Sequence, residues 1–170
     1  MKQFIKDIVS RYLGLLAAIL VGNLLYSALL PLTLYPVYIY LKIFFPVIIQ
    51  GNSLVSADKS IEIVRACIGT SAVLLLLALN LATPSIKSIR RVYLFLYGLT
   101  LFLLFNWARI FLLSVLYLKE SFIFNQIHIA TWYFGSTVAV VAIWLVSIKI
   151  FKIKETPFIS DAVYLAKKIR

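Results

Sequence analysis

Long apolar runs separated by short polar segments dominate the sequence, and this pattern is typical of a polytopic membrane protein. Four runs are long enough for an α-helix to cross about 30 Å of hydrocarbon, which takes roughly 20 residues. They cover about residues 9–30, 66–82, 92–117 and 127–149. The first run is too long for the apolar part of a signal peptide, and we interpret it as a retained anchor. The sequence therefore predicts an all-α fold, a polytopic membrane bundle of about four transmembrane helices, with residues 1–155 as one integral membrane domain.

An apolar segment between the first two runs, residues 32–50, is interrupted by Pro36, Lys42 and Pro46. Proline removes a backbone donor and kinks a helix, and a lysine in the middle of a span is costly. We therefore expect an interfacial or re-entrant segment here rather than a fifth crossing. Residues 52–64 contain two short stretches that flank an Ala-Asp-Lys-Ser turn, and their alternation of apolar and polar positions predicts a small β-hairpin.

The overall composition supports the membrane interpretation. The chain is 63% hydrophobic with a mean hydropathy of +1.01, more apolar surface than a soluble domain of 170 residues can bury. Its net charge of +11 comes from basic residues that cluster beside the apolar runs. This placement indicates membrane orientation and contact with anionic lipids, and we expect no nucleic-acid partner.

Lysine and arginine are distributed unevenly between the two sides that four crossings would create. Twelve lie in the N-terminal flank, the loop 83–91 and the C-terminal end, against four on the other side. The positive-inside rule therefore predicts that both termini are cytoplasmic and that residues 52–64 are extracytoplasmic. Residues 156–170 combine basic and apolar positions, which predicts a cytoplasmic amphipathic tail on the inner leaflet.

Three chemically distinctive residues fall in one predicted layer. Cys67, the only cysteine, is at the outer end of the second span, and His128, the only histidine, is at the outer entrance of the fourth. Arg109 lies within the third span, about 12 Å before its outer end. An arginine inside a span costs at least ~2.5 kcal/mol on insertion scales and marks a candidate functional site. Asn106, three residues before Arg109, shares its helix face.

These residue types fit nucleophilic acyl transfer. A thiol becomes a competent nucleophile when a histidine takes its proton or a cation stabilises the thiolate. Arg109 could stabilise either the thiolate or the oxyanion of an acyl transition state, with Asn106 in support. Gly69 and Ser71 allow close backbone approach beside Cys67. One histidine, one cysteine and no carboxylate within a span cannot supply a zinc site, and the chain has no glycine-rich phosphate loop, so we expect no cofactor or metal.

The same residues resemble the motifs of the exosortase/archaeosortase family of membrane transpeptidases. The resemblance rests on ACIGTSA at residues 66–72, NWAR at residues 106–109 and the histidine at 128, in this order and at the outer ends of successive spans. It implies a cysteine protease and transpeptidase of the cell membrane. The family's nucleophile carries onto Cys67, its arginine onto Arg109 and its third catalytic residue onto His128.

The resemblance also implies partners. The substrates would be secreted proteins that end in a short motif, a transmembrane helix and a basic cluster, and membrane lipids would surround the enzyme. The acceptor could be water, a lipid or a sugar. Two other interpretations of the polar residues stay open: a non-catalytic membrane scaffold or assembly factor, and a small transporter or channel.

Overall fold

The computed structural model describes residues 9–14, 16–17, 20, 22–84 and 86–153. Residues 9–14, 16–17 and 20 are helical. The elements that follow are α2 (Gly22–Phe44), β1 (Ile48–Gln50), β2 (Ser53–Ser56), β3 (Lys59–Glu62), α3 (Arg65–Ile68), α4 (Thr70–Ala82), α5 (Ser88–Leu118), α6 (Phe124–Ala130), the π-helical turn η1 (Thr131–Gly135) and α7 (Ser136–Ile150). The predicted tail at residues 156–170 lies outside the described residues.

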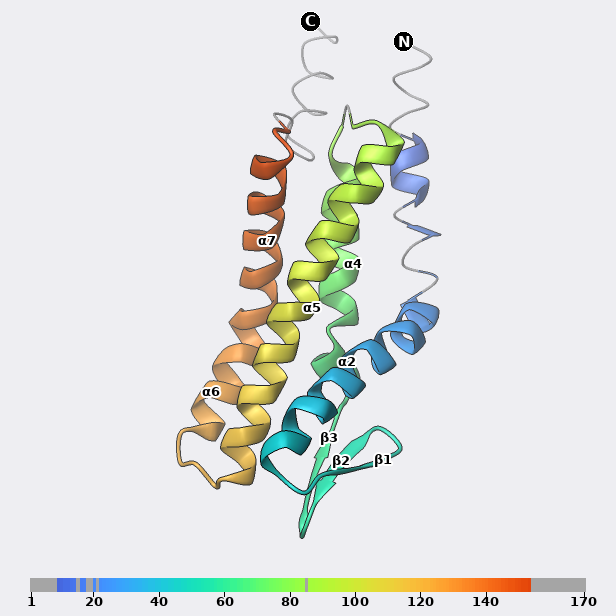
Figure 1. Cartoon of the computed structure of the whole chain (residues 1–170). Coiled ribbons are helices and arrows are strands. Elements are labelled where there is room, and N and C mark those ends of the chain that lie inside the picture. The colour runs from blue at the N-terminus through green and yellow to red at the C-terminus, as the bar shows by residue number, and fades with distance from the viewer. Residues whose placement is uncertain (1–8, 15, 18–19, 21, 85, 154–170) are drawn as a thin grey trace, which may run out of the picture.

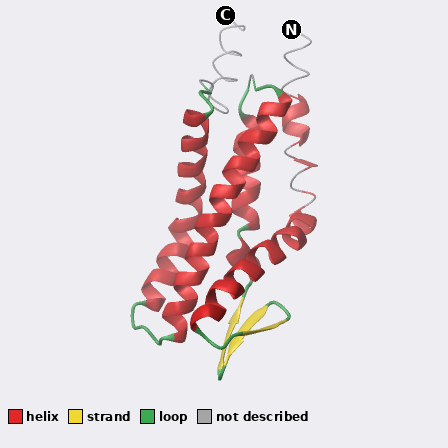
Figure 2. Ribbon diagram, viewed as in Figure 1, coloured by secondary structure: helices red, strands yellow, loops and turns green. Residues whose placement is uncertain are grey.

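Helices α4, α5 and α7 lie side by side along the molecule, and α6 and η1 extend α7 into one long helical stretch (Figure 1). Helix α2 crosses the bundle obliquely near one end and packs against α5 (Figure 1). The strands, which come between α2 and α3 in the sequence, gather at that same end (Figure 2). Side chains from all four long helices form the buried core, among them Val37, Leu41, Val73, Leu76, Phe102 and Val140.

Two of the described helices, α2 and α5, are long and apolar enough to cross a membrane, and α4 and α7 are shorter apolar helices. The predicted spans 66–82, 92–117 and 127–149 coincide with helical segments, while a bundle of four crossings stays a prediction. Large apolar side chains are exposed along α5 and α7, as contact with lipid requires. Examples are Leu104, Leu112, Val138, Val141, Leu145 and Val146.

The helix does not end at residue 30, where the predicted first span ends, because α2 continues through two internal prolines. A proline inside a helix leaves the carbonyl four residues earlier without its donor. For Pro36 that carbonyl belongs to Leu32, and the indole Nε1 of Trp107 on α5 donates a hydrogen bond to it at 2.8 Å. A side chain from another helix thus replaces the missing bond, and residues 32–44 form the second half of α2 rather than a separate segment.

The predicted hairpin is confirmed, and it belongs to a three-stranded antiparallel sheet in the order β1-β2-β3. Ser56 pairs with Lys59, so the two residues between them make the turn. Strand β1 was not predicted, because its residues continue an apolar run without alternation. A signal was present in the Gly51-Asn52 dipeptide before β2, which is typical of a hairpin turn, and Gly51 has a φ of +59°.

The two ends of the bundle carry different elements. At one end, Arg11 donates to the carbonyl of Ala82 at 3.0 Å, and Arg90 donates to the carbonyl of Phe151. These bonds join the N-terminal helical segment, the end of α4, the start of α5 and the end of α7. The sheet, α3 and α6 lie at the other end (Figure 1). Helices α4, α5 and α7 therefore run between these two ends in alternating directions.

Candidate active site

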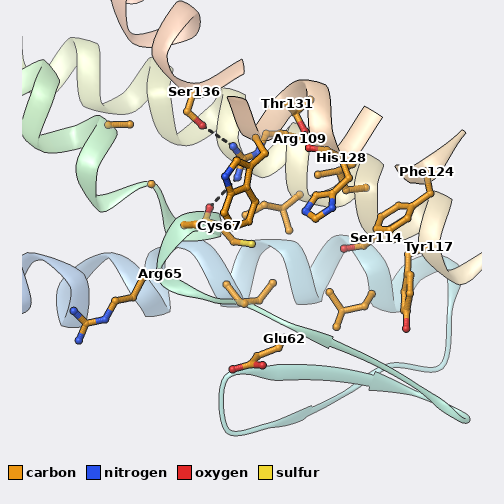
Figure 3. Close-up of a pocket in the computed structure, with 18 of the residues that line it drawn as sticks. Glu62, Arg65, Cys67, Arg109, Ser114, Tyr117, Phe124, His128, Thr131 and Ser136 are labelled. Carbon is orange, nitrogen blue, oxygen red and sulfur yellow. Dashed lines mark hydrogen bonds between the residues drawn. The ribbon is translucent and has the colours of Figure 1, made fainter. Parts of the chain in front are cut away.

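A cavity of about 430 Å³ lies at the end of the bundle that carries the sheet. Cys67, Arg109 and His128 all line it, and their side chains point into the same space (Figure 3). Gly69 and Ser71 line it as well. The structure thus brings together residues from α3, α4, α5 and α6 that the sequence separates widely.

Cys67 is positioned by a sharp bend in the main chain. It lies on α3, a single helical turn that ends at Gly69, which adopts a left-handed conformation with φ +76° and ψ 31°. Glycine adopts this conformation without the steric cost that a Cβ imposes. A Cβ at this position would also lie 2.6 Å from the Cζ atom of Phe102 on α5. Gly69 therefore permits both the bend and the close approach of α5, which leave the half-buried Cys67 beside the cavity.

Two donors from α5 hold the main chain of this bend. The Nδ2 atom of Asn106 donates to the carbonyl of Cys67 at 2.9 Å and to the carbonyl of Ile68 at 3.4 Å. The Nη2 atom of Arg109 donates to the same Cys67 carbonyl at 3.4 Å. Carbonyls at the end of a helix lack hydrogen-bond donors within the helix. Asn106, which is only 1% exposed, donates the hydrogen bonds that these carbonyls need. The Asn-x-x-Arg pair therefore fixes the backbone that carries the thiol, a contact that the sequence did not predict.

The charge of Arg109 has no carboxylate partner among the described residues. Its Nη1 atom donates to Oγ of Ser136 at 2.6 Å, and its Nε atom is buried without a hydrogen-bond partner. A partly buried cation without a counter-ion favours an anion beside it. The geometry thus offers a place for negative charge next to Cys67.

The imidazole of His128 is held between two aromatic rings. Phe124 stacks on it with a centroid distance of 5.4 Å and an interplanar angle of 14°. Trp132 meets it edge-on, at 5.8 Å and 89°. These contacts fix the plane of the imidazole, which faces the cavity wall that carries Cys67 (Figure 3).

The π-helical turn η1 brings His128 and Ser136 onto one face. Eight residues of regular α-helix would leave the two side chains about 80° apart around the axis. A π-helical turn takes up one extra residue, so the other seven amount to nearly two turns and the offset falls to about 20°. Both side chains consequently line the cavity, and Ser136 reaches Arg109.

Among the polar residues of the cavity that were not predicted, three small ones lie on its helical walls: Ser114, Thr131 and Ser136. Small polar residues in apolar helices usually serve packing, so no feature of these three distinguished them in the sequence. The Oγ atom of Ser114 is buried and has no hydrogen-bond partner. In the described part of the chain, no three histidine, cysteine or carboxylate side chains cluster as metal ligands would. The cavity holds the thiol of Cys67, the imidazole of His128 and the guanidinium of Arg109.

A comparison with protein families decides the assignment. The sequence model of the transmembrane exosortase family matches residues 3–148. The chain belongs to the transmembrane exosortase family. No curated protein and no solved structure matches the chain significantly. Membership of this family confirms the resemblance seen in the sequence and indicates a membrane transpeptidase of the sorting type.

Proposed function

We propose that this exosortase is a cysteine peptidase and transpeptidase that cleaves the C-terminal sorting signal of secreted proteins at the outer face of the membrane. One observation carries the proposal. The only thiol of the chain, its only imidazole and the guanidinium of Arg109, which has no carboxylate partner among the described residues, line one cavity, although they come from three separate segments. A scaffold would need no such convergence of a nucleophile, a base and a cation.

The first half of the reaction forms a thioester. His128 takes the proton of the Cys67 thiol, and the sulfur attacks the carbonyl carbon of the scissile peptide bond. The carbonyl oxygen of the resulting tetrahedral intermediate carries a negative charge. When the C–N bond breaks, the leaving amine takes the proton from His128, and the substrate's carbonyl stays bonded to sulfur.

The second half returns the enzyme to its starting state. An acceptor with an O–H or N–H group, or water, attacks the thioester carbonyl while His128 takes its proton. The C–S bond then breaks, the proton passes to the sulfur, and the thiol of Cys67 is restored. Arg109 stabilises the negative charge in both halves, and Asn106 positions the main chain of Cys67.

The proposed sidedness places the cavity outside the cell and both termini in the cytoplasm. The arginines that bind carbonyls at the opposite end of the bundle belong to the predicted cytoplasmic side, Arg11 to the N-terminal flank and Arg90 to the loop 83–91. A secreted substrate whose C-terminal helix still spans the membrane would present the residues before that helix at the same outer level as Cys67. Its basic tail would remain in the cytoplasm.

The test is cleavage of a co-expressed secreted protein from the same genome that ends in a short motif, a transmembrane helix and a basic cluster. We expect Cys67→Ala to abolish cleavage and His128→Ala to slow it by about 10²–10⁴-fold. Arg109→Lys should also impair it, because lysine keeps the charge but loses the planar set of donors. Thr100→Ala, at an exposed position of α5 outside the cavity, is the control.

The amount of each variant in the membrane must be measured, so that misfolding is not mistaken for lost catalysis. Normal cleavage by a well-expressed Cys67→Ala protein would rule out the mechanism. The non-catalytic scaffold would then be the better interpretation of the polar residues.

A further inference from the structure

Strand β3 has a free edge. The N–H group of Ile63 donates to the carbonyl of Asn52 at 3.0 Å, which makes these residues a hydrogen-bonded pair. Such pairs alternate along an antiparallel ladder, so the main-chain groups of Ile61 also point toward β2. Those of Ser60 and Glu62 point the other way. No described residue pairs with these outward main-chain groups.

This free edge faces the cavity that contains Cys67. Successive residues of a strand point to opposite faces, so a cavity lying over one face would touch every second residue. Four consecutive residues, Ser60 to Ile63, line this cavity, which places it along the edge of the strand. The chain then continues through Arg65 and Ala66, which also line the cavity, to Cys67. The unpaired edge therefore leads directly to the thiol.

The opposite wall also presents an unpaired polar group. Ser114 on α5 is 2% exposed, and its buried Oγ atom has no hydrogen-bond partner, although it lines the cavity. A buried hydroxyl without a partner is costly, and a bound polar ligand would remove that cost.

The distance between the two walls is fixed at the turn end of the hairpin. The Nζ atom of Lys59 donates to the carbonyl of Leu118 at 2.9 Å and forms an ion pair with Glu120 at 2.8 Å. Both partners belong to the end of α5 and the residues just after it. The hairpin is therefore tied to α5, and the space beside β3 is a groove with two held walls.

We propose that the substrate segment around the scissile bond binds in this groove as a fourth strand, paired with the free edge of β3. This inference rests on the proposed function and adds the way in which the substrate is held. An added strand would complete the main-chain hydrogen bonds of Ser60 and Glu62 and present its peptide bond to Cys67 at the end of the groove. The affinity comes mainly from the backbone, so an extended peptide free of helical structure is the required partner.

The edge can be tested with proline at Ser60. Proline removes the outward N–H group and places its ring on the edge, while the ladder to β2 keeps its donors. We expect Ser60→Pro to slow cleavage of the co-expressed substrate by about ten-fold or more, since a main-chain bond and access to the edge are both lost. Alkylation of Cys67 by iodoacetamide, which needs no bound strand, should be unchanged.

The matched control is Ile49→Pro on β1. By the same alternation, the main-chain groups of Ile49 point away from β2, at the opposite edge of the sheet, which lies outside the cavity. We expect normal cleavage by this variant. Normal cleavage by Ser60→Pro, with Cys67→Ala inactive, would overturn the strand proposal and leave the proposed function intact. If the unaltered protein forms dimers and Ser60→Pro loses them with unchanged cleavage, the strand proposal is overturned too, because the edge then pairs with a second copy.

A measurement on the substrate avoids the question of enzyme folding. In a paired strand, every second N–H group points to the neighbouring strand. Single prolines placed along the substrate segment before its helix should therefore block and permit cleavage alternately, with a period of two residues. A response without this period would contradict the proposal, whereas Cys67→Ala tested on the unaltered substrate reports on the proposed function alone.

Discussion

Replacing Gly69 with alanine should disrupt the bend that carries Cys67. The left-handed conformation costs about 1–2 kcal/mol for a residue with a Cβ. The new methyl group would also lie 2.6 Å from Cζ of Phe102, which is overpacking and typically costs about 1–3 kcal/mol. Together these effects amount to about 2–5 kcal/mol, a large part of the 5–15 kcal/mol that stabilises a typical protein.

Two further variants separate the conformational cost from the steric cost. Gly51 also has a positive φ, +59°, but an added Cβ would meet nothing within 4 Å, so Gly51→Ala reports the conformational cost alone. Phe102→Leu in the Gly69→Ala background shortens the side chain that clashes. We expect this double variant to recover part of the stability lost by Gly69→Ala, and to stay below the stability of Phe102→Leu alone by the conformational cost.

The assay is thermal unfolding of the purified protein in detergent, followed by tryptophan fluorescence, together with cleavage of the co-expressed substrate. Gly69→Ala should lose more stability than Gly51→Ala, and only Gly69→Ala should lose cleavage strongly, because only Gly69 adjoins the thiol. If Gly69→Ala proves as stable and as active as the unaltered protein, the reasoning about this bend is refuted.

Two other predictions concern the fold and its orientation. Trp107→Phe should lower the stability measured by unfolding in detergent by about 1 kcal/mol, because it removes the donor for the Leu32 carbonyl that Pro36 leaves free. The loss should be smaller in a Pro36→Ala background, and equal losses in both backgrounds would contradict this explanation. Topology reporters fused at Asp58 and Arg170 should lie on opposite sides of the membrane, and the same side for both would disprove the proposed sidedness of the site.

The sequence predicted those elements whose signals are local. Apolar runs predicted the helical segments within 66–82, 92–117 and 127–149, and alternation predicted the hairpin of β2 and β3. The course of α2 could not be predicted, because the helix accommodates Pro36 through a hydrogen bond from Trp107 to the carbonyl of Leu32, and Trp107 is distant in sequence. Local patterns do not contain such a contact.

The site was predictable in its members but not in its contacts. Cys67, Arg109 and His128 were selected because their residue types are unusual at these positions and because they lie in one predicted layer of the membrane. The structure places all three at one cavity. The bond from Arg109 to Ser136 depends on the π-helical turn, which no spacing rule would have included. The convergence of Asn106 and Arg109 on one carbonyl depends on how α5 packs against the bend.

That packing follows from one ridge on α5, and the ridge explains why the thiol lies at its observed level. Buried residues recur every fourth position along the helix, at Leu94, Gly98, Phe102, Asn106, Ile110 and Ser114. Such rows form the ridges by which helices pack. A Cβ at Gly98 would lie 3.2 Å from Leu76, Phe102 lies against Gly69, and Asn106 binds Cys67.

The residue numbers rise along the ridge of α5 while those of the contacted residues fall from Leu76 to Gly69 and Cys67, because the two segments are antiparallel. These contacts form a continuous series. Gly98 leaves room for Leu76 of α4, Phe102 occupies the space that Gly69 leaves open, and Asn106 binds the carbonyl of Cys67. One turn further along α5, Arg109 is necessarily at the level of Cys67. A shift of α4 against α5 by one turn would therefore separate the thiol of Cys67 from the guanidinium of Arg109, and in the proposed mechanism it would take the cation away from the nucleophile.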